Sequence, residues 1–345
     1  MTLQSITIRR PDDWHVHLRD GEMLDRVATH TARQFARAIV MPNLVPPVTS
    51  AETAASYRDR IVAATAGQGF TPLMTCYLTD DVDPDELVRG YGEGVWVAAK
   101  LYPAGATTNS ASGVTDIRNI YPALERMQEI GMVFCIHGEV TDPDVDVFDR
   151  EAVFIERTLA PLVRDFPALK MVLEHITTRQ AAEFVASAPA NVAATVTPQH
   201  LHLNRNALFQ GGLRPHAYCL PIVKREEHRL AVRKAAVSGS PKFFLGTDTA
   251  PHARHAKESA CGCAGIFNAP YALESYATVF EEEGALDKFE GFASEHGANF
   301  YALPLNEGTV TLERDEEYVP ERLGIGDIEL VPFHAGQRLN WTFAG

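Results

Sequence analysis

The chain has 345 residues, of which 46% are hydrophobic, so intrinsic disorder is excluded as a description of the whole chain. Its 45 acidic and 31 basic side chains give a formal net charge of −14, which disfavours nucleic acid and anionic membranes as partners, because both bind clustered Lys and Arg. The five cysteines are few and odd in number, so we expect free thiols and a cytoplasmic protein.

Short β-rich runs alternate with helical stretches along the chain. In order, the predicted strands are Trp14–His17, Ala38–Met41, Leu73–Leu78, Val95–Leu101, Met132–His137, Leu169–Glu174, Val192–Thr197 and Phe243–Thr247. Helices are expected between them, for example over Ala51–Ala64, Tyr121–Ile130, Arg150–Val163 and Arg179–Ser187.

Several predicted strands are nearly continuous apolar runs, which is typical of parallel strands buried on both faces. Eight such strands alternating with helices predict the α/β class and favour a (β/α)8 TIM-type barrel, with an open doubly wound sheet as the alternative. We expect one barrel domain over 1–345. Its barrel covers about 5–305, and a short C-terminal extension over about 306–345 contains strands at Val310–Leu312 and Ile328–Val331.

Three long or Gly/Pro-rich loops follow predicted strands, at Pro103–Gly113, Asn204–Pro221 and Thr249–Pro270. In a barrel these loops lie at the C-terminal face, where active sites form. The first loop is small and polar, so we expect it to be a mobile lid, with Thr107 and Thr108 hydrogen-bonding a bound substrate.

Two histidines lie two residues apart near the end of the first predicted strand. Residues i and i+2 of a strand point to the same face, so His15 and His17 can converge on one metal ion. The spacing alone is a weak signal, because His200 and His202 share it.

Residues with metal-ligand chemistry also stand at the ends of four other predicted strands: Lys100, His137, His175 and Asp248. In a barrel these ends open onto one pocket, and four histidines with an aspartate form a donor set suited to zinc. A lysine ammonium would be repelled by metal ions. If Lys100 belongs to the site, it must be neutral or converted by carbon dioxide to a carbamate, which can bridge two metals.

Taken together, these strand-end residues resemble the pattern of the amidohydrolase superfamily. Within it the chain is similar, nearly end to end, to the dihydroorotases of the shorter, homodimeric bacterial type. The segments that carry the resemblance are Arg10–Asp20, Met41–Asn43, Ala99–Pro103, Ile136–Glu139, Glu174–Thr178 and Gly246–His252.

The resemblance implies a hydrolase acting on a cyclic amide, a zinc-dependent dihydroorotase. Such an enzyme reversibly cyclises N-carbamoyl-L-aspartate to (S)-dihydroorotate plus water in pyrimidine biosynthesis. It implies two zinc ions per chain, bridged by carboxylated Lys100 and a hydroxide, with Asp248 as the proton shuttle. His15, His17 and Asp248 would complete the coordination of one ion, and His137 and His175 that of the other.

The resemblance also implies how the anionic substrate is held. The expected contacts are His17, Leu18, Arg19, Asn43, Leu220, His252 and Ala264, with Leu220 and Ala264 acting through their backbones. It leaves His200 and His202 outside the site, and it makes the stretch around Cys261 and Cys263 a substrate loop.

Two other classes stay open. One is a different cyclic-amide hydrolase, such as a hydantoinase or allantoinase, against which the set of Arg19, Asn43 and His252 argues. The other is a catalytically silent barrel that serves as an assembly partner.

Overall fold

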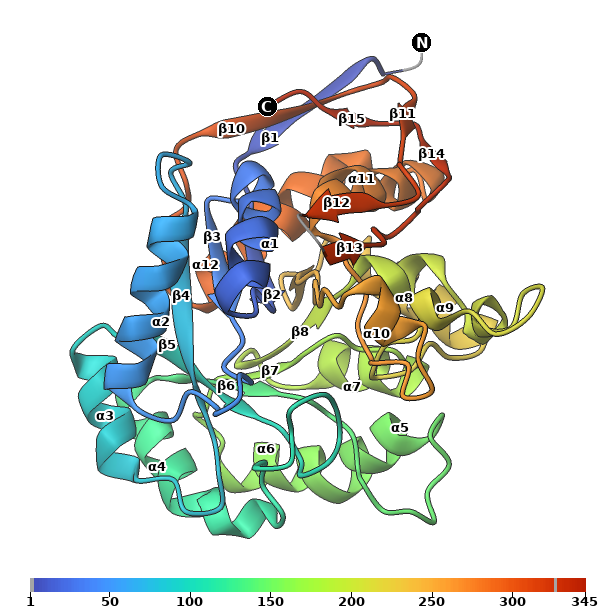
Figure 1. The fold of residues 1–345 in the computed structure, drawn as a ribbon. Coiled ribbons are helices and arrows are strands. Elements are labelled where there is room, and N and C mark those ends of the chain that lie inside the picture. Colours follow the sequence, from blue (N-terminus) through green and yellow to red (C-terminus); the bar gives the residue numbers. More distant parts are fainter. Residues whose placement is uncertain (1–2, 326–327) are drawn as a thin grey trace.

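The computed structural model describes residues 3–325 and 328–345 and shows eight parallel strands surrounded by helices (Figure 1). The strands follow one another in the sheet in chain order: β2 Asp12–Val16, β3 Arg37–Val40, β4 Thr71–Tyr77, β5 Trp96–Leu101, β6 Val133–Ile136, β7 Met171–Leu173, β8 Val192–Val196 and β9 Phe243–Leu245. Each overlaps a predicted strand. A doubly wound sheet would reverse its strand order, so the predicted barrel is confirmed and the open-sheet alternative is wrong.

The barrel closes where β9 meets β2. The backbone N–H of Asp248 donates to the carbonyl oxygen of His15 over 2.9 Å, and that of His17 donates to the carbonyl oxygen of Thr249 over 2.9 Å. These bonds lie just beyond the end of β9. The barrel is therefore joined at the same level as the side chains with metal-ligand chemistry.

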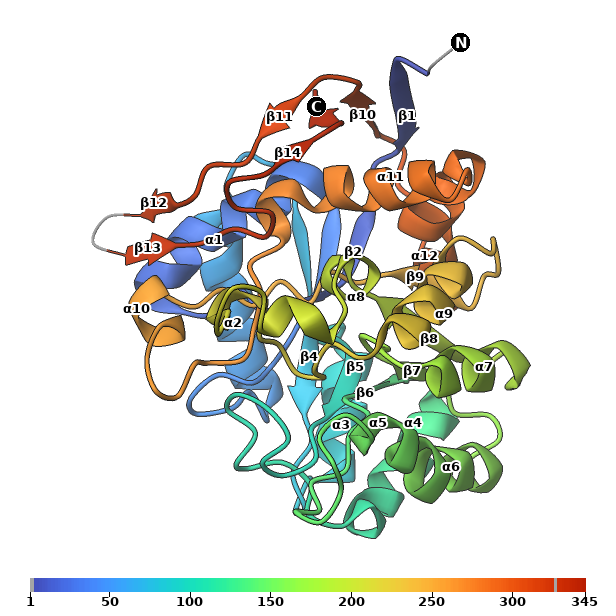
Figure 2. The same ribbon diagram turned by 90° about the vertical axis from the view of Figure 1, so that its right-hand side faces the viewer.

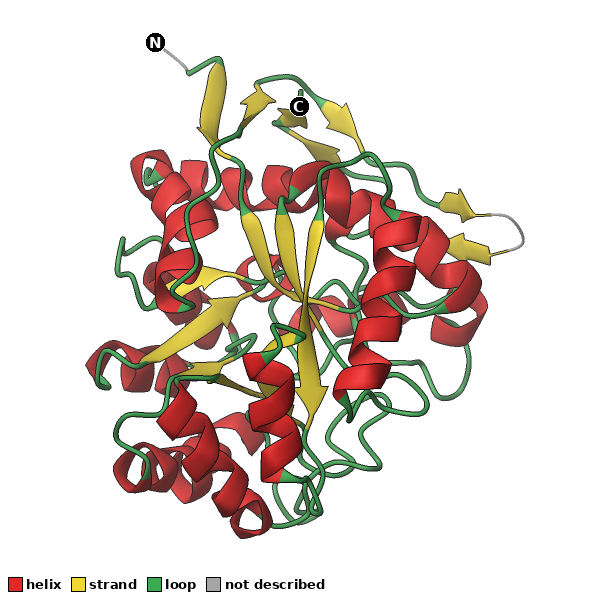
Figure 3. Cartoon of the chain, turned by 90° about the vertical axis from the view of Figure 1, so that its left-hand side faces the viewer, coloured by secondary structure: helices red, strands yellow, loops and turns green. Residues whose placement is uncertain are grey.

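Helices cover the outside of the strands, as Figure 3 shows. They are α1 Gly21–Gln34, α2 Ala51–Ala64, α3 Pro84–Gly92, α4 Tyr121–Ile130, α5 Arg150–Phe154, α6 Ala160–Asp165, α7 Arg179–Ser187, α8 Pro198–His202, α9 Glu226–Ala236, α10 Arg254–Lys257, α11 Ala272–Glu282 and α12 His296–Phe300. Local signals set their ends: Ser50 caps α2 in a capping box, and Gly131 ends α4 in a left-handed conformation. Helices α2, α4 and α7 have the predicted bounds.

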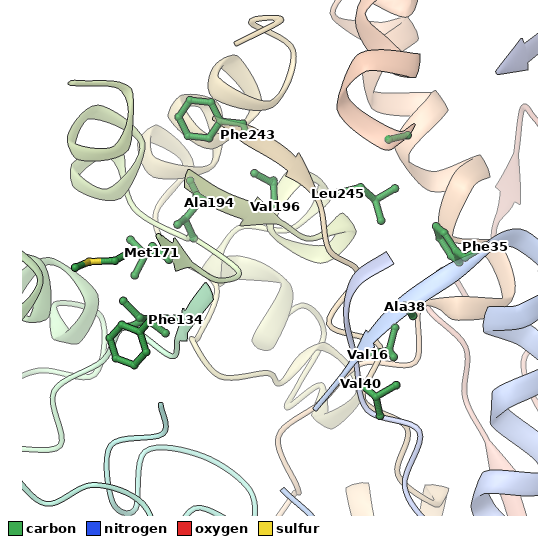
Figure 4. Packing of buried hydrophobic residues seen from close by; sticks show 14 of the residues in the cluster. Val16, Phe35, Ala38, Val40, Phe134, Met171, Ala194, Val196, Phe243 and Leu245 are labelled. Atoms are coloured by element: carbon green, nitrogen blue, oxygen red, sulfur yellow. The ribbon is translucent and has the colours of Figure 1, made fainter. Parts of the chain in front are cut away.

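Buried apolar side chains form an outer layer between strands and helices and a smaller layer inside the barrel. Figure 4 shows part of the outer layer, including Phe134, Phe243 and Leu245. Their strand neighbours Cys135 and Phe244 belong to the inner layer. This alternation follows from the two-residue period of a strand, and it decides which side chains reach the pocket at the strand ends.

The C-terminal segment packs outside the barrel as short antiparallel strands (Figure 2). β10 Thr309–Glu313 and β13 Ile328–Leu330 confirm the two predicted tail strands. β1 Ser5–Arg9 was not predicted; it pairs with β10, which also pairs with β15 Thr342–Phe343. The other tail strands are β11 Glu317–Tyr318, β12 Leu323–Ile325 and β14 Arg338–Leu339. Among the described residues, no helix is long and apolar enough to cross a membrane.

Candidate active site and metal centre

Three polar side chains enter the barrel because they continue the inward alternation of their strands. Lys100, His137 and Glu174 each stand two residues after an inner-layer apolar residue of β5, β6 or β7. All three are buried. Glu174 was not predicted to be a site residue, although the two-residue period from Val172 places it on the inner face.

His175 reaches the same pocket by a different route. Its φ is +44°, and Asp248, which follows β9, has a φ of +49°. Left-handed conformations are costly for side chains other than glycine and cluster at functional sites. The backbone is thus turned sharply where β7 and β9 end, and the strand alternation alone could not predict how these two side chains would point.

His15, His17 and Asp248 form a close triangle of donor atoms. His15 Nε2 lies 3.2 Å from His17 Nε2, and these atoms lie 3.3 and 3.1 Å from Asp248 Oδ1. His17 Nδ1 is 2.9 Å from Asn43 Oδ1, an acceptor, so the ring proton belongs on Nδ1 and the Nε2 lone pair faces the triangle. Three nitrogen and oxygen donor atoms this close together match a divalent cation with N/O ligands.

A second group lies beside the first. His15 Nδ1 is 3.2 Å from Glu174 Oε1, and Lys100 Nζ donates to Glu174 Oε2. The His175 ring lies 5.0 Å from that of His15 and 4.9 Å from that of His137, centroid to centroid. Within the described part of the chain, His175 Nδ1 is buried without a hydrogen-bond partner. Buried polar atoms are nearly always satisfied, so this donor set also fits a cation.

Two further residues of this region were missed at the sequence level. Glu139 Oε2 lies 2.7 Å from His137 Nε2 and so fixes the orientation of that ring. Tyr102 lines the pocket, and Lys100 Nζ lies 4.8 Å from the centre of its ring. The triplet His137-Gly138-Glu139 was a possible signal, because a carboxylate two residues beyond a histidine can reach the same ring.

Burial and charge set the protonation of these groups. Burial lowers the pKa of His17 to about 4 and the pKa of His175 well below its usual value, so both rings are neutral at pH 7. Burial alone would raise the pKa values of Glu174 and Asp248, but neighbouring groups outweigh it. His15 and Lys100 lower the pKa of Glu174 to about 2, and His15 lowers that of Asp248. Neutral imidazoles beside ionised carboxylates are the states that bind metal ions.

A cavity with about 340 Å³ of atom-free space, part of it open to solvent, adjoins this cluster. Its lining includes the strand-end groups His15, His17, His137, His175 and Asp248, and beyond them Arg19, Asn43, Tyr102, Thr107, Thr108, Leu220, Ala250, Ala264 and Gly265. Most of the residues expected to contact substrate are therefore brought together.

Arg19 and His252 meet at one side of the cavity. Arg19 Nη2 lies 2.9 Å from His252 Nε2, and Arg19 Nε donates to the carbonyl of Pro251 over 3.0 Å. His252 Nε2 also lies 3.0 Å from the carbonyl of Ala264, and the tautomer decides which of these contacts is a hydrogen bond. Burial, and then the charge of Arg19, lower the pKa of His252 to about 3, so Arg19 carries the positive charge of the pair.

The loop 103–113 lies across the pocket. Asn43 Nδ2 donates to the carbonyl of Thr108 over 3.0 Å, and Asn109 Nδ2 donates to the carbonyl of Asn43 over 3.0 Å. The Thr108 hydroxyl reaches the carbonyl of Ala264 at 3.4 Å. The loop thus bridges two segments expected to hold substrate, and Thr107 and Thr108 line the cavity.

Other residues singled out from the sequence lie elsewhere. The Leu18 side chain is buried in the outer core, so only its backbone could contact a ligand. His200 bonds the Thr197 hydroxyl and the carbonyl of Pro221, and His202 bonds the carbonyl of Ser275; neither lines the cavity. Cys261 is exposed, Cys263 is half-buried, and both are free thiols.

Comparison with known proteins identifies the family. Residues 12–315 match the amidohydrolase family model. A dihydroorotase from Sphingopyxis alaskensis is 72% identical over 337 residues, covering 97% of this chain and 98% of that protein. The chain belongs to the dihydroorotases of the amidohydrolase family.

Solved structures agree with this assignment. A dihydroorotase from Campylobacter jejuni aligns with a TM-score of 0.92 at 35% identity, covering 100% of this chain and 99% of that one. An L-hydantoinase from Arthrobacter aurescens aligns with a TM-score of 0.82 at 16% identity, covering 98% of this chain and 83% of that one. The second likeness shows the shared barrel fold alone. The hydantoinase and silent-barrel alternatives are therefore not favoured.

Proposed function

We propose that this chain catalyses the reversible cyclisation of N-carbamoyl-L-aspartate to (S)-dihydroorotate plus water with two zinc ions. The observation that carries the proposal is the triangle of His15, His17 and Asp248 beside a cavity that also holds Arg19. Metal ions bound by these donors would act as electrophiles, and the Arg19 guanidinium would bind a carboxylate. A cyclic amide that bears a carboxylate fits a site with both groups.

In this proposal His15, His17 and Asp248 would hold one ion, His137 and His175 would hold the other, and carboxylated Lys100 would be a ligand shared by both. When bound, such ions lower the pKa of water and polarise the ring carbonyl. Carboxylation would turn the contact of Lys100 with Glu174 into one between two anions, so we expect it to depend on metal loading. Intact-mass measurement should show the mass of one added carbon dioxide in metal-loaded protein. An unmodified Lys100 in active protein would contradict this assignment.

Asp248 moves the proton. In hydrolysis its carboxylate accepts a proton from the attacking water and delivers it to the departing ring nitrogen; in cyclisation the direction reverses. Its position supports this role, because Oδ1 lies in the triangle while the residue lines the cavity.

The substrate carboxylate is held opposite the metals. The Arg19 guanidinium can grip it with two hydrogen bonds, and neutral His252 and Asn43 complete the contact. Backbone groups of Leu220 and Ala264 line the same cavity. With a chain at −14, attraction of an anion must come from local charge within a Debye length of roughly 8 Å.

Asp248→Asn tests the proposed mechanism. General acid–base help is typically worth about 10²–10⁴-fold, so losses of that size are expected in both directions with metal still bound. Turnover within about tenfold of wild type would make Asp248 a ligand alone. Assays of hydantoin and allantoin rings with the wild-type chain should show much less activity than dihydroorotate, and the reverse order would favour the other cyclic-amide hydrolases.

The remaining parts of the proposal concern the whole protein. We propose one amidohydrolase barrel domain over 1–345, a homodimer, and a cytoplasmic enzyme. All five cysteines are free, which fits a reducing compartment. Sedimentation of the purified protein tests the dimer.

A further inference from the structure

Lys257, the last residue of α10, is a buried lysine that the proposed mechanism does not use. The residue is 3% exposed. Its ammonium donates three hydrogen bonds to backbone carbonyls: to Tyr218 over 2.9 Å, to Cys263 over 2.9 Å and to Gly265 over 2.6 Å. An ammonium has three N–H groups, so each one has an acceptor.

The charge of Lys257 is held by peptide dipoles rather than by a carboxylate. Among the ion pairs of residues 3–325 and 328–345, none includes Lys257. Burial lowers its pKa to about 8, so the ammonium form with its three donors still predominates near neutral pH. Burying a cation without a counter-ion is costly, and here the three hydrogen bonds to carbonyl groups offset part of that cost.

The segment that Lys257 binds is strained at Cys263. This residue has a φ of +24°, which is costly for a residue with a side chain, whereas Gly262 and Gly265, at +74° and +147°, adopt conformations that glycine tolerates. A Cβ added at Gly265 would lie 2.5 Å from the carbonyl oxygen of Ala250, so this backbone packs tightly against the start of its own loop. Conformations of this kind persist only where surrounding contacts hold them.

Ala264 lies between two carbonyls that Lys257 binds, at Cys263 and Gly265. Its own carbonyl is 3.0 Å from His252 Nε2 and 3.4 Å from the Thr108 hydroxyl. The third carbonyl, of Tyr218, also accepts from the N–H of Gly265 over 3.1 Å and stands two residues before Leu220. Through these hydrogen bonds Lys257 holds the two backbone stretches that line the cavity at Ala264 and Leu220.

We propose that Lys257 is a positioning residue for substrate binding, which acts by holding the backbone of Ala264 and Leu220 in the shape that receives the carboxylate-bearing substrate. This inference rests on the proposed function, because it assumes that the substrate contacts those backbones. Lys257 touches neither the reacting atoms nor the metal-type cluster, so its role lies in binding rather than in the chemical step.

The test is Lys257→Met, which keeps the apolar stem and removes the ammonium. Loss of interactions made equally in the ground and transition states raises KM, and about 1.4 kcal/mol corresponds to tenfold. We expect KM for dihydroorotate to rise at least about tenfold, with kcat within about threefold of wild type and metal content unchanged. Lys257→Gln keeps two N–H donors without the charge and should show a smaller rise in KM.

Lys242→Met is the matched control. Lys242 also donates to two backbone carbonyls, of Val185 and Ala188, but it lies near the start of β9, at the opposite end of the barrel from the cavity. Its KM should stay at the wild-type value even if its stability falls. A folded, metal-loaded Lys257→Met with unchanged KM, or with a fall in kcat alone, would overturn the inference.

The remaining outcomes are also decisive. If both Lys257 variants fail to fold while Lys242→Met folds, Lys257 is required for folding and the narrower positioning role is overturned. If the wild-type chain itself does not turn over dihydroorotate, the proposed function fails, and that failure is seen before any variant is compared.

Discussion

Asp13 and Thr247 join the first and last strands of the barrel. Asp13 Oδ2 accepts from the Thr247 hydroxyl over 2.6 Å, and Oδ1 accepts from the Thr247 N–H over 2.9 Å. Asp13 precedes His15 by two residues, and Thr247 immediately precedes Asp248. One carboxylate thus sets the distance between two members of the metal-type triangle.

Asp13→Asn should loosen this junction, because the new amide group would face a donor. Leaving buried partners unsatisfied costs roughly 1–3 kcal/mol, and the variant should also hold metal less tightly. Thermal unfolding and metal titration measure the two effects. The exposed substitution Asp59→Asn is the control and should change neither. Wild-type metal affinity in folded Asp13→Asn would show that the junction does not position the ligands.

Glu151 supports the strained turn that contains His175. Its buried carboxylate accepts hydrogen bonds from the N–H and hydroxyl groups of Thr177 and Thr178, at 2.5 to 3.1 Å. Glu151→Gln replaces one acceptor oxygen by a donor. Loss of a partner that orients a ligand typically lowers metal affinity about 10–100-fold, so we expect that loss at the site of His137 and His175. Exposed Glu156→Gln serves as control; equal metal affinity in the two variants would remove Glu151 from this role.

The double variant Thr107→Ala/Thr108→Ala tests the loop 103–113. It removes the hydroxyls of two residues that line the cavity but keeps the backbone contact from Asn43 to Thr108. Turnover should fall at least roughly tenfold, the equivalent of one or two hydrogen bonds lost from the closed state, with metal content unchanged. Ser112→Ala, at an exposed position of the same loop, should keep full activity. Wild-type kinetics in the double variant would contradict the prediction that this loop is a lid with Thr107 and Thr108 bonded to substrate.

Glu274 makes stability depend on pH. Burial raises its pKa from 4.5 to about 7 in the folded chain, where it accepts from Gln34 Nε2 over 2.8 Å. The folded state therefore binds more protons than the unfolded state between pH 4.5 and 7. The contribution of protonated Glu274 to the free energy of unfolding is complete below pH 4.5 and is lost as pH rises through about 7.

Glu274→Gln removes this titration. The difference between the free energies of unfolding of the variant and of wild type should increase by on the order of 2–3 kcal/mol from pH 4.5 to pH 8, because wild type loses stability over this range and the variant does not. Denaturant unfolding at several pH values measures the difference, with exposed Glu52→Gln as the control. Parallel pH profiles for wild type and Glu274→Gln would show that Glu274 is ionised in the folded chain.

The sequence predicted most where a periodic pattern decides the structure. The eight strands, and helices such as α2, follow from apolar runs and caps, and strand ends correctly grouped His15, His17 and Asp248. Glu174 was not predicted, although the strand period places it on the inner face, and His175 reaches the same pocket only through its left-handed backbone. The contacts of Lys257 and Glu151 could not be predicted, because they depend on the backbone geometry of irregular loops, and the bonds of Lys257 to Tyr218 and of Glu151 to Thr177 also join segments far apart in sequence.

The central claim is a two-metal dihydroorotase site at these strand ends, and metal content measured alongside dihydroorotate hydrolysis tests it most directly. The donor set exceeds what one tetrahedral zinc requires. We predict that activity rises with added metal up to two transition-metal ions per chain, disappears on chelation and returns when both ions are restored. Full activity with one tightly bound ion, and no gain when more metal is added, would contradict the account.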